Sequence, residues 1–127
     1  MRRIVIDMQN FLFSDAVKQT LVNFDSDFEI HTSDRPEKTA ELCCAVHPYA
    51  LIMEVTGYMP WRIDERLKIR DEVLKHNPGC KIALVVDEHT EKKLADRVRQ
   101  AKKDGLIDNF IYSSVSATYL SAVIDTL

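Results

Sequence analysis

Five short apolar segments, separated by longer stretches with helical periodicity, are the feature that most constrains the fold of this chain. Their residue types and lengths predict strands over residues 3–7, 28–32, 50–54, 81–86 and 109–112. Strands that alternate with helices along a chain form repeated βα units, and such units build a parallel sheet. We therefore predict an α/β fold with five parallel strands.

Three of the predicted strands are apolar almost throughout, which indicates a sheet covered by helices on both faces. Residues 4–6, 51–53 and 82–86 contain only aliphatic side chains and methionine. Residues 28–31 instead alternate between apolar and polar side chains, as expected of a strand at the edge of the sheet. With right-handed crossovers, these features predict a doubly wound, flavodoxin-like sheet in the order 2-1-3-4-5.

The segments between the strands carry signals for helix starts and ends. Asp34 is expected to cap the second helix, and Gly105 suits the left-handed turn after the fourth. In the first helix, Ala16, Leu21 and Val22 are predicted to face the sheet. The five predicted helices cover residues 11–23, 34–45, 63–76, the segment from after Thr90 to Gly105, and 116–127.

Length and charge limit the kinds of function this chain can have. A chain of 127 residues with 46% hydrophobic and 29% charged residues is typical of one globular domain, here residues 1–127. The formal net charge of -3 argues against direct nucleic-acid binding by this domain, since such surfaces concentrate Lys and Arg. No apolar run is long enough for a membrane span, and the first residues do not resemble a signal peptide. We expect a cytoplasmic protein with no membrane contact.

The three cysteines, Cys43, Cys44 and Cys80, are odd in number and contain no C-x-x-C pair. This pattern favours reduced thiols over a disulfide framework. The adjacent pair Cys43-Cys44 has two interpretations, a sensor of oxidants or soft metals and a pair of small residues buried in a helix. The second is favoured, because no histidine or third cysteine stands nearby at ligand spacing.

The chemistry of an open parallel sheet concentrates at the carboxyl ends of its strands, near the point where the strand order reverses. In the predicted order this point lies between the first and third strands, which end at Asp7 and Glu54. Two neighbouring carboxylates destabilise each other's charged forms unless a cation or a basic group lies between them. Asp7, Glu54 and the backbone carbonyl of Thr56 are therefore a candidate Mg²⁺ site, because Mg²⁺ takes oxygen ligands in near-octahedral geometry.

The same strand ends resemble those of response-regulator receiver domains of the chemotaxis-receiver kind. The segment Val5-Ile6-Asp7-Met8 is similar to the family's first strand, which ends in an acidic pair. Residues 48–55 (PYALIMEV) are similar to its third strand, which ends in the phosphoacceptor aspartate, so Glu54 is the phosphoacceptor equivalent. The resemblance covers the whole chain. It implies a receiver fold and a role in two-component phosphorelay signalling rather than an enzyme activity.

Most of the functional positions that the resemblance implies carry a different residue here. Asp7 alone keeps its identity, whereas Met8 replaces the second acid and Val86 replaces a Thr or Ser hydroxyl. Ser113 stands where the family has a lysine, and Phe110 stands where it has a switch aromatic. The hydroxyl and the lysine form an electrostatic clamp on the phosphoryl group. Their replacement argues against conventional phosphorylation by a histidine kinase.

Glu54 itself has two interpretations that the sequence leaves open. In the first, its longer carboxylate projects toward the place of a phosphoryl group and imitates the modified state. In the second, a polar residue at this strand end was merely tolerated once the rest of the clamp was lost.

Three functions follow from these patterns. The favoured one is an atypical receiver, or pseudo-receiver, which acts as a signalling and protein-interaction module and regulates transcription through an attached or separate output. The second is a receiver phosphorylated on Glu54 with Mg²⁺ bound. The third, a flavodoxin-like small-ligand-binding protein, is disfavoured because no strand end carries a glycine-rich phosphate loop. The expected partner is a protein, an output domain, or a second copy in a homodimer through the fourth helix, fifth strand and fifth helix.

Overall fold

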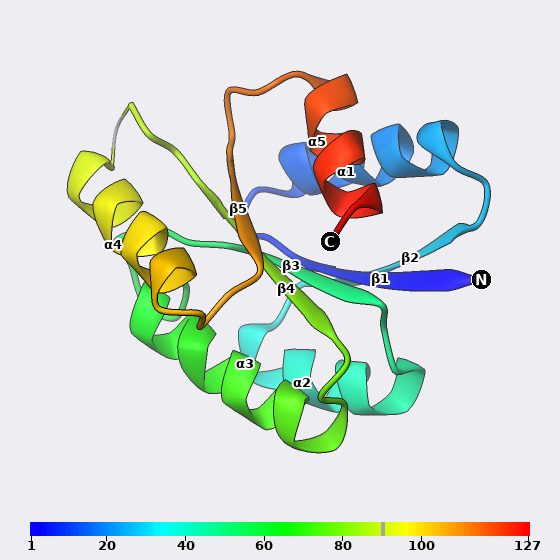
Figure 1. Cartoon of the computed structure of the whole chain (residues 1–127), viewed down its shortest axis with the longest axis horizontal. Coiled ribbons are helices and arrows are strands. Elements are labelled where there is room, and N and C mark those ends of the chain that lie inside the picture. The colour runs from blue at the N-terminus through cyan, green and yellow to red at the C-terminus, as the bar shows by residue number, and fades with distance from the viewer. Residues whose placement is uncertain (90) are drawn as a thin grey trace.

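Five parallel strands form one sheet in the order β2-β1-β3-β4-β5, in a computed structural model that describes residues 1–89 and 91–127 (Figure 1). Every pair of neighbouring strands is parallel. The predicted fold class and strand order are therefore confirmed. The strands are β1 (Arg2–Asp7), β2 (Phe28–Ser33), β3 (Ala50–Glu54), β4 (Lys81–Val86) and β5 (Asn109–Tyr112).

Helices cover both faces of this sheet, as the continuous apolar strands predicted. The helices of the described residues are divided between the two faces (Figure 1). The first face carries α1 (Phe11–Phe24) and α5 (Ala117–Asp125). The second carries α2 (Pro36–Val46), α3 (Ile63–His76) and α4 (Lys92–Lys103). Among the described residues, no helix is long and apolar enough to cross a membrane.

Each face of the sheet has its own hydrophobic core, because successive side chains of a strand point to opposite faces. Ile4 and Ile6 of β1 belong to the core shared with α1 and α5. Val5 belongs to the core shared with α2, α3 and α4. All three side chains have no exposed surface, so β1 is buried on both faces. The double burial explains why the central strands have no alternating polar residues.

The buried stripe of α1 differs from the predicted one. Ser14, Val17 and Leu21 are buried, whereas Ala16 and Val22 are exposed, so only Leu21 of the predicted set faces the sheet. The buried residues follow the three- and four-residue spacing of a single helical face. A serine occupies the first position of that stripe, and this polar residue concealed the periodicity.

The start of α2 also differs from the prediction. Arg35, not Asp34, is the N-cap residue, and no side chain caps this helix end. Pro36 is the first helical residue, and a proline forces the residue before it into an extended conformation, here φ -127° and ψ 107° for Arg35. Asp34 stands one position too early to cap the helix, so the predicted aspartate cap is wrong.

The end of α4 agrees with the sequence analysis. Gly105 has φ of +76°, the left-handed conformation predicted for the turn after this helix. Thr90, after which the same helix was predicted to begin, lies outside the described residues.

Candidate functional site

The carboxyl ends of β1 and β3 bring Asp7 and Glu54 to the same edge of the sheet, as predicted. The two strands are direct neighbours, with Asp7 paired to Met53 in the register. Their carboxylates nevertheless lie in different surroundings. Asp7 is fully buried, whereas Glu54 is partly exposed. The two side chains therefore play different parts in the site.

The Asp7 carboxylate is bound by Arg66 of α3. Arg66 Nη1 donates to Asp7 Oδ2 at 2.7 Å, and Nη2 donates to Oδ1 at 3.2 Å. The two hydrogen bonds form the bidentate fork that matches a guanidinium to a carboxylate. Neither side chain has more than 1% exposed surface. The site therefore contains a fully buried ion pair.

Arg66 also binds the main chain at the ends of both central strands. Its Nε donates to the carbonyl oxygen of Glu54 at 2.8 Å. Its Nη2 donates to the carbonyl oxygen of Asp7 at 3.1 Å. Buried polar groups are costly unless they are hydrogen-bonded, and these contacts give a donor to the carbonyl group of each strand's last residue. One side chain thus ties α3 to β1 and β3.

A pair of hydroxyls completes the surroundings of Asp7 on the side of α2. Thr39 Oγ1 donates to Asp7 Oδ2 at 2.5 Å, and Thr39 is fully buried. Ser33, at the end of β2, places its Oγ 2.9 Å from Thr39 Oγ1. Ser33 Oγ also donates to the carbonyl oxygen of Arg35 at 3.1 Å, which ties the end of β2 to the start of α2. The network reaches from α3 through β1 to β2 and α2.

Glu54 is held by the backbone of the loop between β1 and α1. Its Oε1 accepts hydrogen bonds from the amide groups of Gln9 at 2.8 Å and Asn10 at 3.2 Å. Asn10 is also the N-cap of α1, and its side chain accepts a hydrogen bond from the amide of Phe13. Amides near a helix start favour an anion. The Glu54 carboxylate is that anion here.

The other predicted site residues of this edge lie at or just after the ends of strands β1, β3, β4 and β5. Met8 follows Asp7 and is 3% exposed. Val86, at the end of β4, is part of the core, and Ser113 donates its amide to the Val86 carbonyl at 3.0 Å. Thr56 follows β3, and its amide donates to Trp61 in the loop before α3.

Phe110 belongs to the edge strand β5, which β4 separates from the strand that ends at Glu54. Its ring meets that of Tyr112 edge to face, with centroids 5.4 Å apart. Both rings line a separate groove between α4 and α5, described below. The assignment of Phe110 to the site therefore still rests on the family resemblance and not on a contact with the other site residues.

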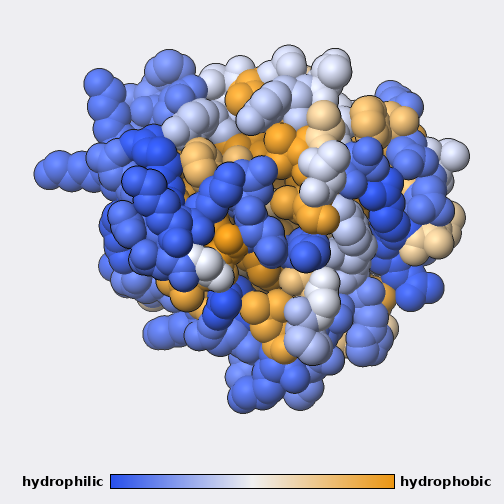
Figure 2. All heavy atoms as spheres, viewed as in Figure 1, coloured by the Kyte–Doolittle hydropathy of each residue, from blue (hydrophilic) through white to orange (hydrophobic). Residues whose placement is uncertain are grey.

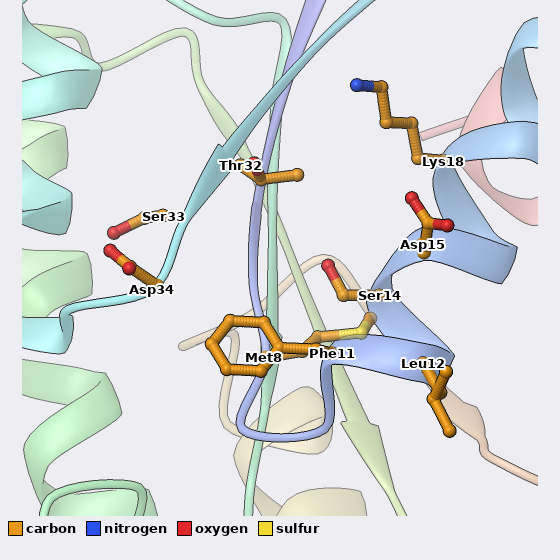
Figure 3. A pocket seen from close by; sticks show the side chains of 9 residues that line it. All are labelled: Met8, Phe11, Leu12, Ser14, Asp15, Lys18, Thr32, Ser33 and Asp34. Atoms are coloured by element: carbon orange, nitrogen blue, oxygen red, sulfur yellow. The ribbon is translucent and has the colours of Figure 1, made fainter.

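A groove of about 530 Å³ opens beside the site, between α1 and the end of β2 (Figure 3). Figure 3 shows residues from the first turns of α1 on one side and residues from the end of β2 on the other. Phe11 and Leu12 on its rim are 68% and 85% exposed. The residues lining it are Met8, Phe11, Leu12, Ser14, Asp15, Lys18, Thr32, Ser33 and Asp34.

Solved structures share this arrangement of strands and helices over nearly the whole chain. A CheY-like response-regulator receiver domain protein from Methanospirillum hungatei JF-1 is 16% identical, with a TM-score of 0.75 over 99% of this chain and 92% of its own. A response-regulator receiver domain protein from Clostridium thermocellum is also 16% identical, with a TM-score of 0.78 over 99% and 93%. The chain has the receiver fold.

A third similar structure is a DNA-binding response regulator of the LuxR family from Staphylococcus aureus. It is 17% identical, with a TM-score of 0.70 over 99% of this chain and 95% of that one. No protein-family model and no curated protein sequence matches the chain. The likeness to receivers is therefore one of fold, carried by three-dimensional structure at low sequence identity.

The candidate Mg²⁺ site of this receiver fold has few free ligands. Both Asp7 oxygens are occupied by Arg66 and Thr39, and Glu54 Oε1 is occupied by two amides. Met8 offers a thioether, which is a soft ligand unsuited to Mg²⁺. Across the described residues, no group of three or more His, Cys, Asp or Glu side chains is placed to hold a metal ion. The residues present do not fit the Mg²⁺ ion predicted for this site.

Sequence analysis missed Arg66 and Thr39, which donate hydrogen bonds to the Asp7 carboxylate. Arg66 lies in the buried stripe of α3 together with Ile63 and Val73. A charged residue inside an apolar stripe indicates a buried ion pair, because such residues are rarely buried without a partner. The position of Arg66 was therefore a usable signal. Its partner was not readable from the sequence, since Asp7 is 59 residues away.

Proposed function

We propose that this chain is an atypical receiver domain of the two-component response-regulator type, acting as a signalling and protein-interaction module rather than as an enzyme. It is not switched by conventional aspartate phosphorylation. The observation that carries the proposal is the bound carboxylate of Glu54, which two backbone amides hold at the end of β3. In this proposal Glu54 is the phosphoacceptor equivalent, and its carboxylate is an anion that the protein itself binds.

The neighbouring positions support the same proposal. A phosphoryl group develops negative charge that a receiver stabilises with a cation and hydrogen-bond donors. Val86 supplies only an apolar side chain packed in the core, and Ser113 supplies no charge. Met8 removes one acidic ligand. Each replacement lowers the stabilisation available to a transferred phosphoryl group.

The hydrogen bonds of Glu54 favour imitation of the modified state over simple tolerance. A side chain tolerated at a strand end has no need of specific partners, whereas Glu54 is fixed by Gln9 and Asn10. Charge-assisted hydrogen bonds of this kind are stronger than neutral ones. The arrangement suits a receiver held in one signalling state.

The proposed output surface is formed by α4, β5 and α5. Its centre is a groove of about 310 Å³. Figure 2, drawn from the same side as Figure 1, shows hydrophobic residues in the middle of the molecule with hydrophilic residues around them. The Lys102 ammonium lies 5.7 Å from the centroid of the Phe110 ring, and Arg99 donates to the Tyr112 hydroxyl at 2.6 Å. Cations beside aromatic rings suit a partner that presents acidic and apolar side chains. The lining residues are Lys102, Asn109, Phe110, Tyr112, Val115 and Tyr119.

The partner on this surface is a protein in the proposal. It is an attached or separate output domain that controls transcription, or a second copy of the chain in a homodimer. The domain itself makes no direct contact with nucleic acid or membrane, and it works in the cytoplasm. The net charge of -3 supports a protein partner over nucleic acid.

A phosphorylation assay tests the proposal. The purified chain is incubated with a small acyl phosphodonor and Mg²⁺, and its intact mass is measured under conditions that preserve acyl phosphates. We expect no added phosphate on the wild type, because the clamp residues are absent. A phosphorylatable receiver treated in parallel shows that the donor is active.

The variant Glu54→Gln is the matched control for the site of any modification. It retains the length of the side chain while removing the carboxylate that could be phosphorylated. Phosphate that appears on the wild type and disappears in Glu54→Gln would establish the phosphorelay alternative with Glu54 as acceptor. That result would overturn the proposed function.

A further inference from the structure

We infer that Arg66 is the resident cation of the acidic pocket, and that this pocket is not a divalent-metal site in this protein. The inference goes beyond the proposed function, because it concerns the charge of Asp7 and not the modification of Glu54. It also explains how a fully buried carboxylate is kept at Asp7.

The first step concerns the charge balance around Asp7. Asp7 is fully buried, and a buried carboxylate is unstable without a counter-charge or hydrogen bonds. Arg66 supplies one positive charge through two donor atoms, and Thr39 supplies a further donor. The carboxylate is therefore neutralised by the protein itself.

The second step concerns what a metal ion would have to displace. A guanidinium cannot be deprotonated in a protein, so Arg66 stays charged whatever binds nearby. A divalent ion on Asp7 would leave that charge buried and facing a second cation. Arg66 has no exposed surface, and its neighbours in the buried stripe, Ile63 and Val73, are also buried. Moving Arg66 out of the pocket would therefore disrupt the packing of α3.

The third step concerns the ligands that remain. Mg²⁺ requires near-octahedral oxygen ligands and gives up its waters reluctantly. Glu54 Oε1 is engaged by Gln9 and Asn10. The Glu54 and Asp7 carbonyl oxygens, which could otherwise face an ion, accept hydrogen bonds from Arg66. Arg66 thus binds the Asp7 carboxylate and the carbonyl oxygens of Asp7 and Glu54.

The consequence is a site whose geometry does not depend on divalent cations. Arg66 joins the ends of β1 and β3 to α3 through four hydrogen bonds that are part of the fold. Adding Mg²⁺ or removing it with a chelator leaves these contacts unchanged.

Metal titration of the wild-type chain is the direct test. Mn²⁺ is added to the ¹⁵N-labelled protein, and paramagnetic broadening of the amide signals of Asp7, Met8 and Thr56 is recorded. Thermal unfolding is followed in MgCl₂ and in NaCl of equal ionic strength. We expect no selective broadening of these signals and the same midpoint in both salts.

Saturable broadening of these three signals that is lost in Asp7→Asn would overturn the inference. This outcome is distinct from a failure of the proposed function. Phosphate on Glu54 would contradict the proposed function and would leave the role of Arg66 unchanged. The wild-type titration gives an answer even where a variant fails to fold.

A pair of variants tests the role of Arg66 independently of metal. Arg66→Met removes the charge and leaves Asp7 buried without a partner, and we expect the unfolding constant to rise by roughly 100-fold or more. The double variant Asp7→Asn with Arg66→Met removes both charges and is expected to recover a large part of this loss. Arg62→Met is the matched control on the same helix, because Arg62 pairs with Glu65 at the surface. Equal losses in Arg66→Met and Arg62→Met would contradict the inference.

Discussion

Cys43 and Cys80 illustrate how burial sets the chemistry of single side chains in this fold. Their exposed fractions are 1% and 3%, and all three cysteines are free. Burial raises the pKa of each of these two thiols to about 12, with smaller contributions from Cys80, Cys44 and Asp7 at Cys43 and from Asp108 at Cys80. Only the thiolate is an effective nucleophile or metal ligand. Cys43 is thus a buried residue of α2, as the favoured interpretation of the pair predicts for it.

Thiol reactivity should separate the three cysteines. At about pH 8, we expect a thiol-specific reagent to modify partly exposed Cys44 first, and Cys43 and Cys80 only after unfolding. Mass spectrometry of the labelled peptides identifies the order. Rapid labelling of Cys43 in the native protein would contradict the burial argument.

The same thiols make stability depend on pH in the alkaline range. In the unfolded chain a thiol ionises near its ordinary pKa of 9.0, whereas in the folded chain the pKa is raised to about 12. The unfolded state therefore loses protons first, and stability falls as pH rises from about 9 toward 12. In urea titrations, a double Cys43→Ala, Cys80→Ala variant should show a shallower fall over this range.

The sequence predicted the residues of the site better than their contacts. Asp7 and Glu54 were placed together because strand ends and strand order are readable from apolar patterns. Their hydrogen-bond partners were not, because Gln9, Asn10 and Arg66 reach them through space and through loop geometry. A pattern of residue types specifies which edge of the sheet carries the site. It does not specify which donor turns toward which carboxylate.

Helices and strands were predictable to the extent that local signals decided their ends. The bounds of β3, β4, β5 and α3 agree with the prediction, since apolar runs and a Pro-Gly turn mark them. The cap of α2 was missed because Pro36 moves the helix start by one residue. The buried face of α1 was missed because a serine lies in it. In α2 a neighbouring proline outweighed the capping preference of aspartate, and in α1 packing against the sheet outweighed the usual exposure of serine.

The end of α4 gives a prediction at the scale of the element. Gly105 has φ of +76° and no atom within 4 Å of an added Cβ, so Gly105→Ala is penalised by the backbone alone. We expect a loss of about 1 kcal/mol in the free energy of unfolding, measured by urea denaturation.

Gly79→Ala is the matched control for that experiment. An added Cβ at Gly79 would lie 3.8 Å from Asn77 Oδ1, an ordinary contact, and Gly79 lacks the left-handed φ. Its effect should stay within about 0.5 kcal/mol. Equal losses in the two variants would show that the left-handed turn is not what α4 requires.

On the scale of the whole molecule, the ion-pair network and the proposed output surface lie on different parts of the sheet. The network joins β1, β2 and β3 to α2 and α3. The surface formed by α4, β5 and α5 lies at the opposite edge strand, since β5 ends the sheet beyond β4. A partner on that surface can therefore bind without disturbing the buried charges.

Charge reversal tests this surface. Lys92 and Lys93 are exposed on α4, and no ion pair of the described residues includes either of them. Replacing both with glutamate should weaken self-association or partner binding by roughly tenfold, because an acidic partner would then be repelled. Sedimentation equilibrium measures self-association, and a titration with the partner measures partner binding. The matched control is the double variant Lys68→Glu, Lys75→Glu on α3. It changes the net charge by the same amount and should leave both affinities unchanged.

Arg66 has a practical consequence for anyone who would design a phosphorylation switch on this domain. Restoring an aspartate at Glu54, an acid at Met8, a hydroxyl at Val86 and a lysine at Ser113 would rebuild the positions that the resemblance identifies. Asp7 would still be enclosed by the guanidinium and by Thr39. The obstacle to such a design therefore lies on the buried face of α3, outside the positions that the resemblance identifies.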